Sequence, residues 1–440
     1  MKNRLLLRIL LCVCLMLGCG AFCLLAHMEV ANRQAAVLEL DRRIEEGAPD
    51  VFVNAAAQRD FDIYLNWGPA SEWDDALYTI VAPEGFLLRS YSQYWDEANL
   101  QSLYEELMRN KHGEEVNYLE EVTVYPEENE SALASHASSK ETLLLTPHFP
   151  ALQEFSISLS RYTGTISLYG GDVIHTVEGM AKTLSHEYGH HFVSYYMFDD
   201  LMDADADVET YIRIRGLPED KVLNRSDNAD DAQYLDMHYW YVGEIAAEDY
   251  VLLMGSPATR QVVDCYDVWD LLYGAVQPEA SLANGAMNLF PQENLMIPLA
   301  SDVDGLKEYF YSFIDETPTP TPQTPSFDLR IEPDSVGYQL EDGYETFVHY
   351  KIRWDKPYAE AGVVYTLLCY DSENYSIIPI KTVHDGEEAL AYIGTVTVDY
   401  GSSIMYMSDR MDTGTKTFHV SAVLPDGTVA LSEPLTYTFD

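Results

Sequence analysis

One stretch, residues 177–195, constrains this chain more than any other part of it. Its apolar side chains recur every three or four residues, which predicts a helix packed along one side. At about 100° per residue, His186 and His190 fall on the opposite side of that helix from the apolar stripe. A helix with one packed face and one histidine-bearing face is expected at the centre of its domain. The stripe comprises Val177, Ala181, Leu184, Tyr188, Phe192 and Tyr195.

The histidine face indicates a metal site. His186 and His190 are four residues apart, so a helix stacks one imidazole above the other. Two such rings can bind one zinc ion, and Glu187 then lies beside the open coordination position, where it can accept a proton from bound water. The alternative is a pair of core or surface histidines that happen to have this spacing.

A third metal ligand is expected on a later element, and residues 241–250 supply candidates. Glu244 and Glu248 share one face of a predicted helix, and small alanines at 246 and 247 allow that helix to approach the first one closely. We expect Glu244 to bind zinc, and Glu248 to accept the second ring N–H of a ligand histidine. The roles of the two glutamates could be exchanged, and a pair of solvated acids is the simpler alternative.

His186-Glu187-Tyr188-Gly189-His190, followed by Glu244-x-x-x-Glu248, resembles the gluzincin zinc metallopeptidases. Glutamate at 248 is more similar to the anthrax-lethal-factor-type branch than to the thermolysin-like branch, which has aspartate there. The resemblance covers residues 166–254 and is specific for the metal site. It implies an α+β zincin-like catalytic domain, a Zn2+ ion on His186, His190 and Glu244, and hydrolysis of peptide bonds with Glu187 as general base.

Members of this family also use a tyrosine or histidine to stabilise the oxyanion. His238 and Tyr239 are the catalytic candidates that we name, and Tyr234 and Tyr241 are alternatives. None of the four has a decisive spacing match to the family. The remaining histidines near the motif, His175 and His191, are interpreted as structural.

The N-terminal segment, residues 1–28, is expected to anchor the chain in the cell membrane. Residues 9–26 carry no charge, and as a helix they would span about 27 Å of a hydrocarbon core of about 30 Å. Basic residues precede this run, so the catalytic domain should lie outside. A cleaved signal of a secreted protein and a lipoprotein attached through Cys19 are the alternatives. Residues 29–50 resemble a short helical stalk.

Charge excludes one class of partner. The net charge is -46, and a nucleic-acid-binding surface needs the opposite sign. Four of the six cysteines lie in the first 25 residues. The remaining pair, Cys265 and Cys369, cannot form a disulfide framework.

Residues 51–315 are expected to form the metallopeptidase domain. Within it, residues 100–108 predict an amphipathic helix, and residues 122–125 and 165–169 predict strands. Asp172 is a plausible N-cap for the histidine-bearing helix. The strand at 165–169 could be a sheet edge that pairs with an extended peptide, or an ordinary interior strand.

A Thr/Pro-rich linker, residues 316–326, predicts a polyproline-type spacer between two folded units. Beyond it, residues 327–440 contain short strand-like runs separated by turns, typical of an immunoglobulin- or fibronectin-like β-sandwich. The runs lie at 347–354, 363–368, 395–398 and 417–423, with a turn at 425–427. No catalytic constellation occurs there, so this domain is expected to act as a spacer or to bind a surface protein or glycan.

These observations predict an extracytoplasmic, membrane-anchored zinc endopeptidase that acts on a peptide or protein substrate. The rival hypothesis is a non-catalytic surface adhesion protein with a degenerate zincin domain and a functional β-sandwich. The presence of Glu187 between the two histidines favours the enzyme, because a degenerate site has no need of a general base.

Overall fold

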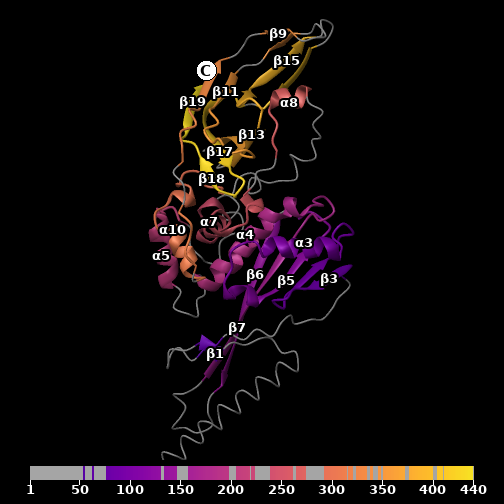
Figure 1. The fold of residues 1–440 in the computed structure, drawn as a ribbon, viewed down its shortest axis with the longest axis vertical. Helices are drawn as coiled ribbons and strands as arrows, with labels where there is room; N and C mark the ends of the chain where they lie inside the picture. The colour runs from indigo at the N-terminus through magenta and orange to yellow at the C-terminus, as the bar shows by residue number, and fades with distance from the viewer. Residues whose placement is uncertain are drawn as a thin grey trace, which may run out of the picture.

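A computed structural model of the chain (Figure 1) describes residues 53–54, 62–63, 76–129, 133–145, 157–197, 205–218, 220–222, 238–260, 264–273, 292–314, 316–320, 324–333, 337–339, 345–347, 350–371, 376–399, 404–409 and 411–439. The expected anchor at 1–28 and stalk at 29–50 lie outside these residues. Across the described ranges, no helix has both the length and the apolar character needed to cross a membrane.

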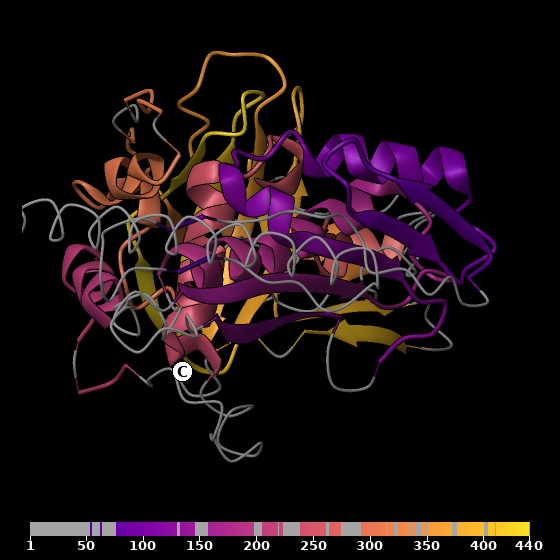
Figure 2. The same ribbon diagram turned by 90° about the horizontal axis from the view of Figure 1, so that it is seen from below.

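The first region is built on a seven-stranded mixed sheet whose strands run side by side (Figure 2). Strand order is β2-β1-β7-β5-β4-β3, with β6 also paired to β7. Strands β4, β5 and β7 are mutually parallel, whereas β3 and β6 run antiparallel to their neighbours. The bounds are β1 (Val53–Asn54), β2 (Asp62–Ile63), β3 (Tyr78–Val81), β4 (Leu87–Ser90), β5 (Leu119–Val124), β6 (Ala134–Leu145) and β7 (Ile157–Leu168).

Strand β7 occupies an interior position. It pairs with β6 along one side and with β5 and β1 along the other. Of the two alternatives left open for residues 165–169, the interior strand is therefore correct. Within the described ranges, the pairing of β6 is with β7 alone.

Alternate residues of the parallel strands bury one face of the sheet under helices. Five side chains on that face are at most 1% exposed, and they join α3 (Glu97–Leu107) and α4 (Val177–Tyr196) in a single core. This agrees with the period of two expected for a strand that is packed on one side. The five are Leu88, Val122, Val124, Ile166 and Leu168.

Shorter helices follow in the sequence, and some of them pack against α4. They are η1 (Glu114–Tyr118), α5 (Asp205–Arg215), η3 (His238–Trp240), α7 (Val242–Met254), η4 (Ala258–Arg260), α8 (Val268–Tyr273), η6 (Ala300–Asp302) and α10 (Leu306–Ser312). The expected helices at 100–108, 177–195 and 241–250 are confirmed as α3, α4 and α7.

The C-terminal region contains three antiparallel sheets of four, three and five strands. The strand-like runs expected at 363–368, 395–398 and 417–423 are confirmed as strands, and residues 425–427 form the predicted turn. The run expected at 347–354 instead covers parts of two strands, at 345–347 and 350–353, which belong to different sheets. The bounds are β8 (Arg330–Pro333), β9 (Gly337–Gln339), β10 (Glu345–Phe347), β11 (Tyr350–Arg353), β12 (Val364–Asp371), β13 (Ser376–Val383), β14 (Leu390–Ile393), β15 (Thr395–Asp399), β16 (Ile404–Ser408), β17 (Gly414–Val423), β18 (Val429–Leu431) and β19 (Leu435–Phe439).

The two regions are in direct contact, so the Thr/Pro segment does not hold them apart (Figure 1). Gly427 has φ +83°, and a Cβ atom there would come within 2.7 Å of the Pro257 Cα atom. Such a close approach of two backbones requires a glycine. Apolar side chains of the C-terminal sheets, among them Leu368 and Val423, belong to the same core cluster as α4 and α7.

Residues 264–273 cross from the first region to the second. The Cys265 backbone N–H donates to the Thr382 hydroxyl, and the Thr382 backbone N–H donates to the Cys265 carbonyl. The Asp267 carboxylate accepts the backbone N–H of Tyr392 at 2.8 Å. Lys381 on β13 forms ion pairs with Asp267 and Asp270 at 3.3 and 2.7 Å. This segment, expected to belong to the peptidase domain, therefore packs on the C-terminal sheets. Cys265 and Cys369 are both buried.

Candidate metal centre

Helix α4 carries the site, and its N-terminus is set by Thr176. The Thr176 hydroxyl accepts the backbone N–H of Gly179 at 3.1 Å, a typical N-cap bond. The prediction of Asp172 as the cap is wrong. Its carboxylate instead accepts a hydrogen bond from the Ser92 hydroxyl at 2.7 Å, and residues 173–176 precede the helix.

Helix α7 crosses α4 at the level of the histidines. A Cβ atom on Gly189 would lie 2.8 Å from the Ala247 carbonyl oxygen and 3.0 Å from its Cα atom. Ala246 and Ala247 are fully buried, as expected if small residues allow close approach. This contact brings Glu244, in the first turn of α7, against the histidine face of α4.

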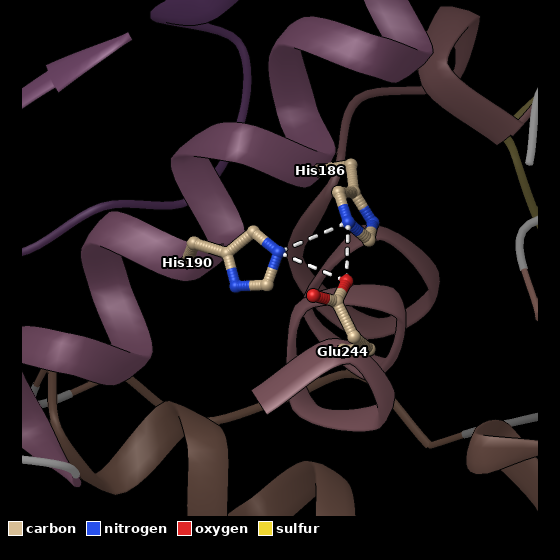
Figure 3. A group of neighbouring side chains, drawn as sticks. All are labelled: His186, His190 and Glu244. Carbon is tan, nitrogen blue, oxygen red and sulfur yellow. Dashed lines mark hydrogen bonds and ion pairs between the residues drawn. The ribbon is translucent and has the colours of Figure 1, made fainter. Parts of the chain in front are cut away.

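Three donor atoms converge at this crossing (Figure 3). The two histidine Nε2 atoms are 3.1 Å apart, and Glu244 Oε2 lies 3.2 Å from His186 Nε2 and 3.1 Å from His190 Nε2. Tetrahedral zinc with bonds of 2.0–2.1 Å would hold its ligand atoms about 3.3–3.4 Å apart. The triangle therefore has nearly the dimensions that a zinc ion requires.

Hydrogen bonding alone does not account for this triangle. Each Nε2 carries at most one hydrogen, which points in a single direction in the ring plane. If both rings donate to Glu244, the two N–H groups face each other at 3.1 Å without a bond between them. A cation placed against all three atoms would satisfy each of them, so the residues fit a metal ion.

The Glu244 carboxylate and the neighbouring histidines strongly affect each other's pKa. Burial would raise the pKa of Glu244, but the imidazoles of His190 and His238 lower it well below its usual value. Burial would lower the pKa of His190, but the Glu244 carboxylate raises it. The carboxylate thus attracts positive charge to this point, and either protons or a metal cation can provide it.

Glu187 lies beside the three donors without belonging to the triangle. Its side chain is 5% exposed, and burial raises the pKa of its carboxyl group. His190 and His186 oppose that rise, while Glu244 adds to it. A carboxylate with a raised pKa, adjacent to a metal site, is suited to general-base chemistry near neutral pH.

His238 is brought to the centre, and Glu293 holds it there. His238 Nε2 is 3.2 Å from Glu244 Oε2, and its Nδ1 is 2.9 Å from Glu293 Oε2. Burial lowers the pKa of His238, but Glu244 and Glu293 together raise it to about 11. Sequence reasoning did not find Glu293, because it lies on a loop with no periodic pattern and no motif spacing.

The other oxyanion candidates lie elsewhere or are not described. The Tyr239 ring packs in the hydrophobic core and is tilted against Trp240, with 6.1 Å between centroids. Tyr241 is the N-cap residue of α7 and makes no side-chain capping bond. Tyr234 lies outside the described residues. His238 is thus the candidate whose side chain the structure places against Glu244.

Glu248 has a different partner from the one expected. Its Oε1 atom accepts the backbone N–H of Glu293 at 2.8 Å, rather than a ring N–H of a ligand histidine. Burial and the Glu293 carboxylate raise its pKa well above the usual value. Glu248 therefore fixes the loop that carries Glu293, because the α7 helix directs its side chain to that backbone.

Three further histidines have different surroundings. His191 is fully buried and its Nε2 donates to the Glu115 carbonyl at 2.8 Å, in line with the structural role expected for it. His175 stacks on Tyr94 with 3.9 Å between ring centroids. Sequence reasoning missed His136 on β6, whose ring lies 6.3 Å from that of His190 at an interplanar angle of 11°.

Comparison with known proteins finds no family model that matches this chain, and no curated sequence matches it either.

Proposed function

We propose that this chain is a zinc-dependent endopeptidase of the gluzincin type, with zinc bound by His186, His190 and Glu244. The convergence of these three donors at 3.1–3.2 Å, with the Glu187 carboxylate beside them, is the observation that carries the proposal. One open coordination position with a neighbouring base is the arrangement that a hydrolytic zinc site needs.

Each residue has a distinct task in the proposed reaction. A bound zinc ion would act as a Lewis acid and lower the pKa of a water molecule. Glu187 accepts the proton of the attacking water and delivers it to the leaving amine. His238, held by Glu293, donates a hydrogen bond from its Nε2–H group to the oxygen that becomes negative as the carbonyl is attacked.

Two features of the environment support this assignment. Low exposure of Glu187, Glu244 and His186, at 5%, 8% and 4%, strengthens electrostatic interactions in the site. The mixed sheet beside α4, with β6 antiparallel at its margin, is compatible with a zincin-like catalytic domain. We also propose that the C-terminal sheets form an immunoglobulin- or fibronectin-like unit, and that residues 1–28 anchor the enzyme with its catalytic region outside the cell.

A substitution that separates chemistry from metal binding tests the proposal. Glu187→Gln keeps the side-chain shape but cannot accept a proton at neutral pH, so zinc content should stay at about one per chain while turnover falls by about 10²- to 10⁴-fold. The matched control is Glu178→Gln, which changes an exposed glutamate in the first turn of the same helix.

The assay is digestion of a peptide library by the full chain, with zinc measured in every sample. Wild type and Glu178→Gln should cleave the library, and a chelator should stop both. A zinc-loaded Glu187→Gln chain that cleaves at the wild-type rate would refute the mechanism. A wild-type chain without zinc after expression in zinc-replete medium would refute the metal assignment.

A further inference from the structure

A cavity of about 360 Å³ lies where the first region, the Thr/Pro segment and the C-terminal sheets meet. The end of α7, helix α10 and the turn between β17 and β18 line it. Cavities of this size at the junction of two folded regions commonly bind small molecules. The cavity shares no residue with the metal centre.

The charge of its lining is opposite to that of the chain. Basic residues number 26 against 72 acidic ones in the whole sequence. Around the cavity the balance is reversed, with four cations and a single carboxylate, Asp426. The cations are Arg109, Lys111, Arg260 and Lys307. Such a concentration of scarce positive charge favours an anionic occupant.

Two of these cations have no carboxylate among their hydrogen-bond partners in the described part of the chain. Arg260 donates to the carbonyl oxygens of residues 251, 255 and 427, at 3.0, 2.6 and 3.2 Å. Lys307 donates to the Thr319 carbonyl at 2.7 Å. Carbonyl groups orient these side chains without neutralising them, and each cation retains unused N–H groups.

The other two cations are paired at the rim. Arg109 contacts Glu106 at 2.6 Å and Lys111 contacts Glu316 at 2.7 Å. The Arg109 and Lys111 side chains are 62% and 46% exposed, so both cations are accessible from solvent, whereas Glu106, the partner of Arg109, is buried. Ser301, which also lines the cavity, has a buried hydroxyl oxygen without a hydrogen-bond partner among the described residues.

Burial also affects the titration of these two cations. It lowers the pKa of Arg260 to about 10, against the opposing effect of Asp426. Burial, and next the positive charge of Arg260, lower the pKa of Lys307, while Glu308 and Asp426 act in the opposite direction. A bound anion would relieve both effects.

From the lining charges, the unused donors and the Ser301 hydroxyl, we propose that this cavity binds a small oxyanion, namely a carboxylate, sulfate or phosphate group on a compact molecule. Lys307 and Arg260 bind it from within, Arg109 and Lys111 attract it at the rim, and Ser301 donates a hydrogen bond. The occupant contacts both regions of the chain and so stabilises their junction.

Calorimetric titration of the full chain with inorganic sulfate, and separately with succinate, tests the proposal. Saturable binding with about one site per chain is expected from at least one probe, and a higher melting temperature should accompany it. The tighter probe shows whether a tetrahedral anion or a dicarboxylate fits better. No saturable binding of either probe at millimolar concentrations would overturn the proposal.

Variants locate the site. Lys307→Gln and, independently, the exposed Arg109→Gln should each weaken binding by about tenfold or more. Lys356→Gln is the matched control, because Lys356 also donates to backbone carbonyls but lies in the C-terminal region away from the cavity. His186→Ala should leave binding unchanged. Loss of binding in His186→Ala, or full binding in both cavity variants, would place the anion elsewhere and overturn the proposal.

Discussion

The crossing of α4 and α7 makes Gly189→Ala an informative perturbation of the metal centre. The added methyl group would lie 2.8 Å from the Ala247 carbonyl oxygen and 3.0 Å from its Cα atom. Ordinary carbon–oxygen contact requires about 3.4 Å, so one helix must shift by roughly 0.6 Å. Both neighbouring atoms belong to the backbone and cannot rotate away.

The shift can be compared with what the metal tolerates. Ligand distances in a functional site vary by about 0.2 Å, and Glu244 lies three residues before Ala247 on the helix that must move. We therefore expect zinc affinity to fall by at least about 10- to 100-fold. Overpacking costs about 1–3 kcal/mol, while replacing glycine by alanine within a helix returns about 0.5–1 kcal/mol. The net loss of unfolding free energy should be about 0–2.5 kcal/mol.

Gly243→Ala is the matched control. It adds the same methyl group to α7, next to Glu244, where no atom lies within 4 Å of the new Cβ position. This variant should keep wild-type zinc affinity and gain about 0.5–1 kcal/mol of stability. Zinc titration against a competing chelator and urea denaturation measure both quantities. If Gly189→Ala and Gly243→Ala give the same zinc affinity, the close packing of the two helices does not determine the site.

Two other predictions concern groups around the centre. Glu293→Gln removes the charge that, together with Glu244, raises the pKa of His238. The alkaline limb of the pH–rate profile should therefore move to lower pH, and kcat should fall while KM and zinc content stay the same. An unchanged profile would contradict the role of Glu293. Burial lowers the pKa of Lys182 to about 7, so between about pH 7 and 10.5 the unfolded chain binds a proton that the folded chain does not, and stability should rise with pH. Lys182→Met should remove this rise and should be more stable than the wild type at pH 7 by at least about 1 kcal/mol. Urea denaturation at several pH values measures both effects. If the stability of the two proteins changes with pH in the same way, Lys182 does not cause the rise.

Sequence reasoning located the helices of the site because local pattern determined them. The stripe around His186 and His190 and the Glu244–Glu248 pair have helical spacing, and side chains four residues apart must share a face. Which partner each side chain then meets depends on segments far away in the chain. Glu248 accepts the backbone N–H of Glu293, and His136 on strand β6 approaches His190 on helix α4. Neither contact leaves a periodic signal in the sequence.

The error at the start of α4 has a cause that is distant in the sequence. Asp172 and Thr176 are both good capping residues, and they lie four residues apart, within the usual uncertainty of a helix boundary. The choice between them depends on Ser92, in the loop after β4, whose hydroxyl donates a hydrogen bond to the Asp172 carboxylate. Thr176 is then the residue free to cap Gly179.

Contact between the two regions, which the sequence does not reveal, changes what a truncation should do. A Thr/Pro-rich segment suggests independent units, and on that basis residues up to 316 should suffice for hydrolysis of a short peptide. In the structure, Asp267 is 2% exposed and paired with Lys381. Apolar residues of the C-terminal sheets, such as Leu368 and Val423, complete the core around α4 and α7.

Removal of residues 317–440 would leave Asp267 without its cation and expose the apolar surface that the sheets cover, each a recognised cause of large destabilisation. We expect the truncated chain to unfold at lower urea concentration than the full chain and to retain less zinc, because α7 carries Glu244 and loses packing at its far end. Co-expression of residues 317–440 as a separate chain is the control, since non-covalent association should restore zinc retention if contact, rather than chain continuity, is what matters. A truncated chain with the unfolding midpoint and zinc content of the full protein would show that the first region folds independently, and that the contacts across residues 264–273 add nothing to the site.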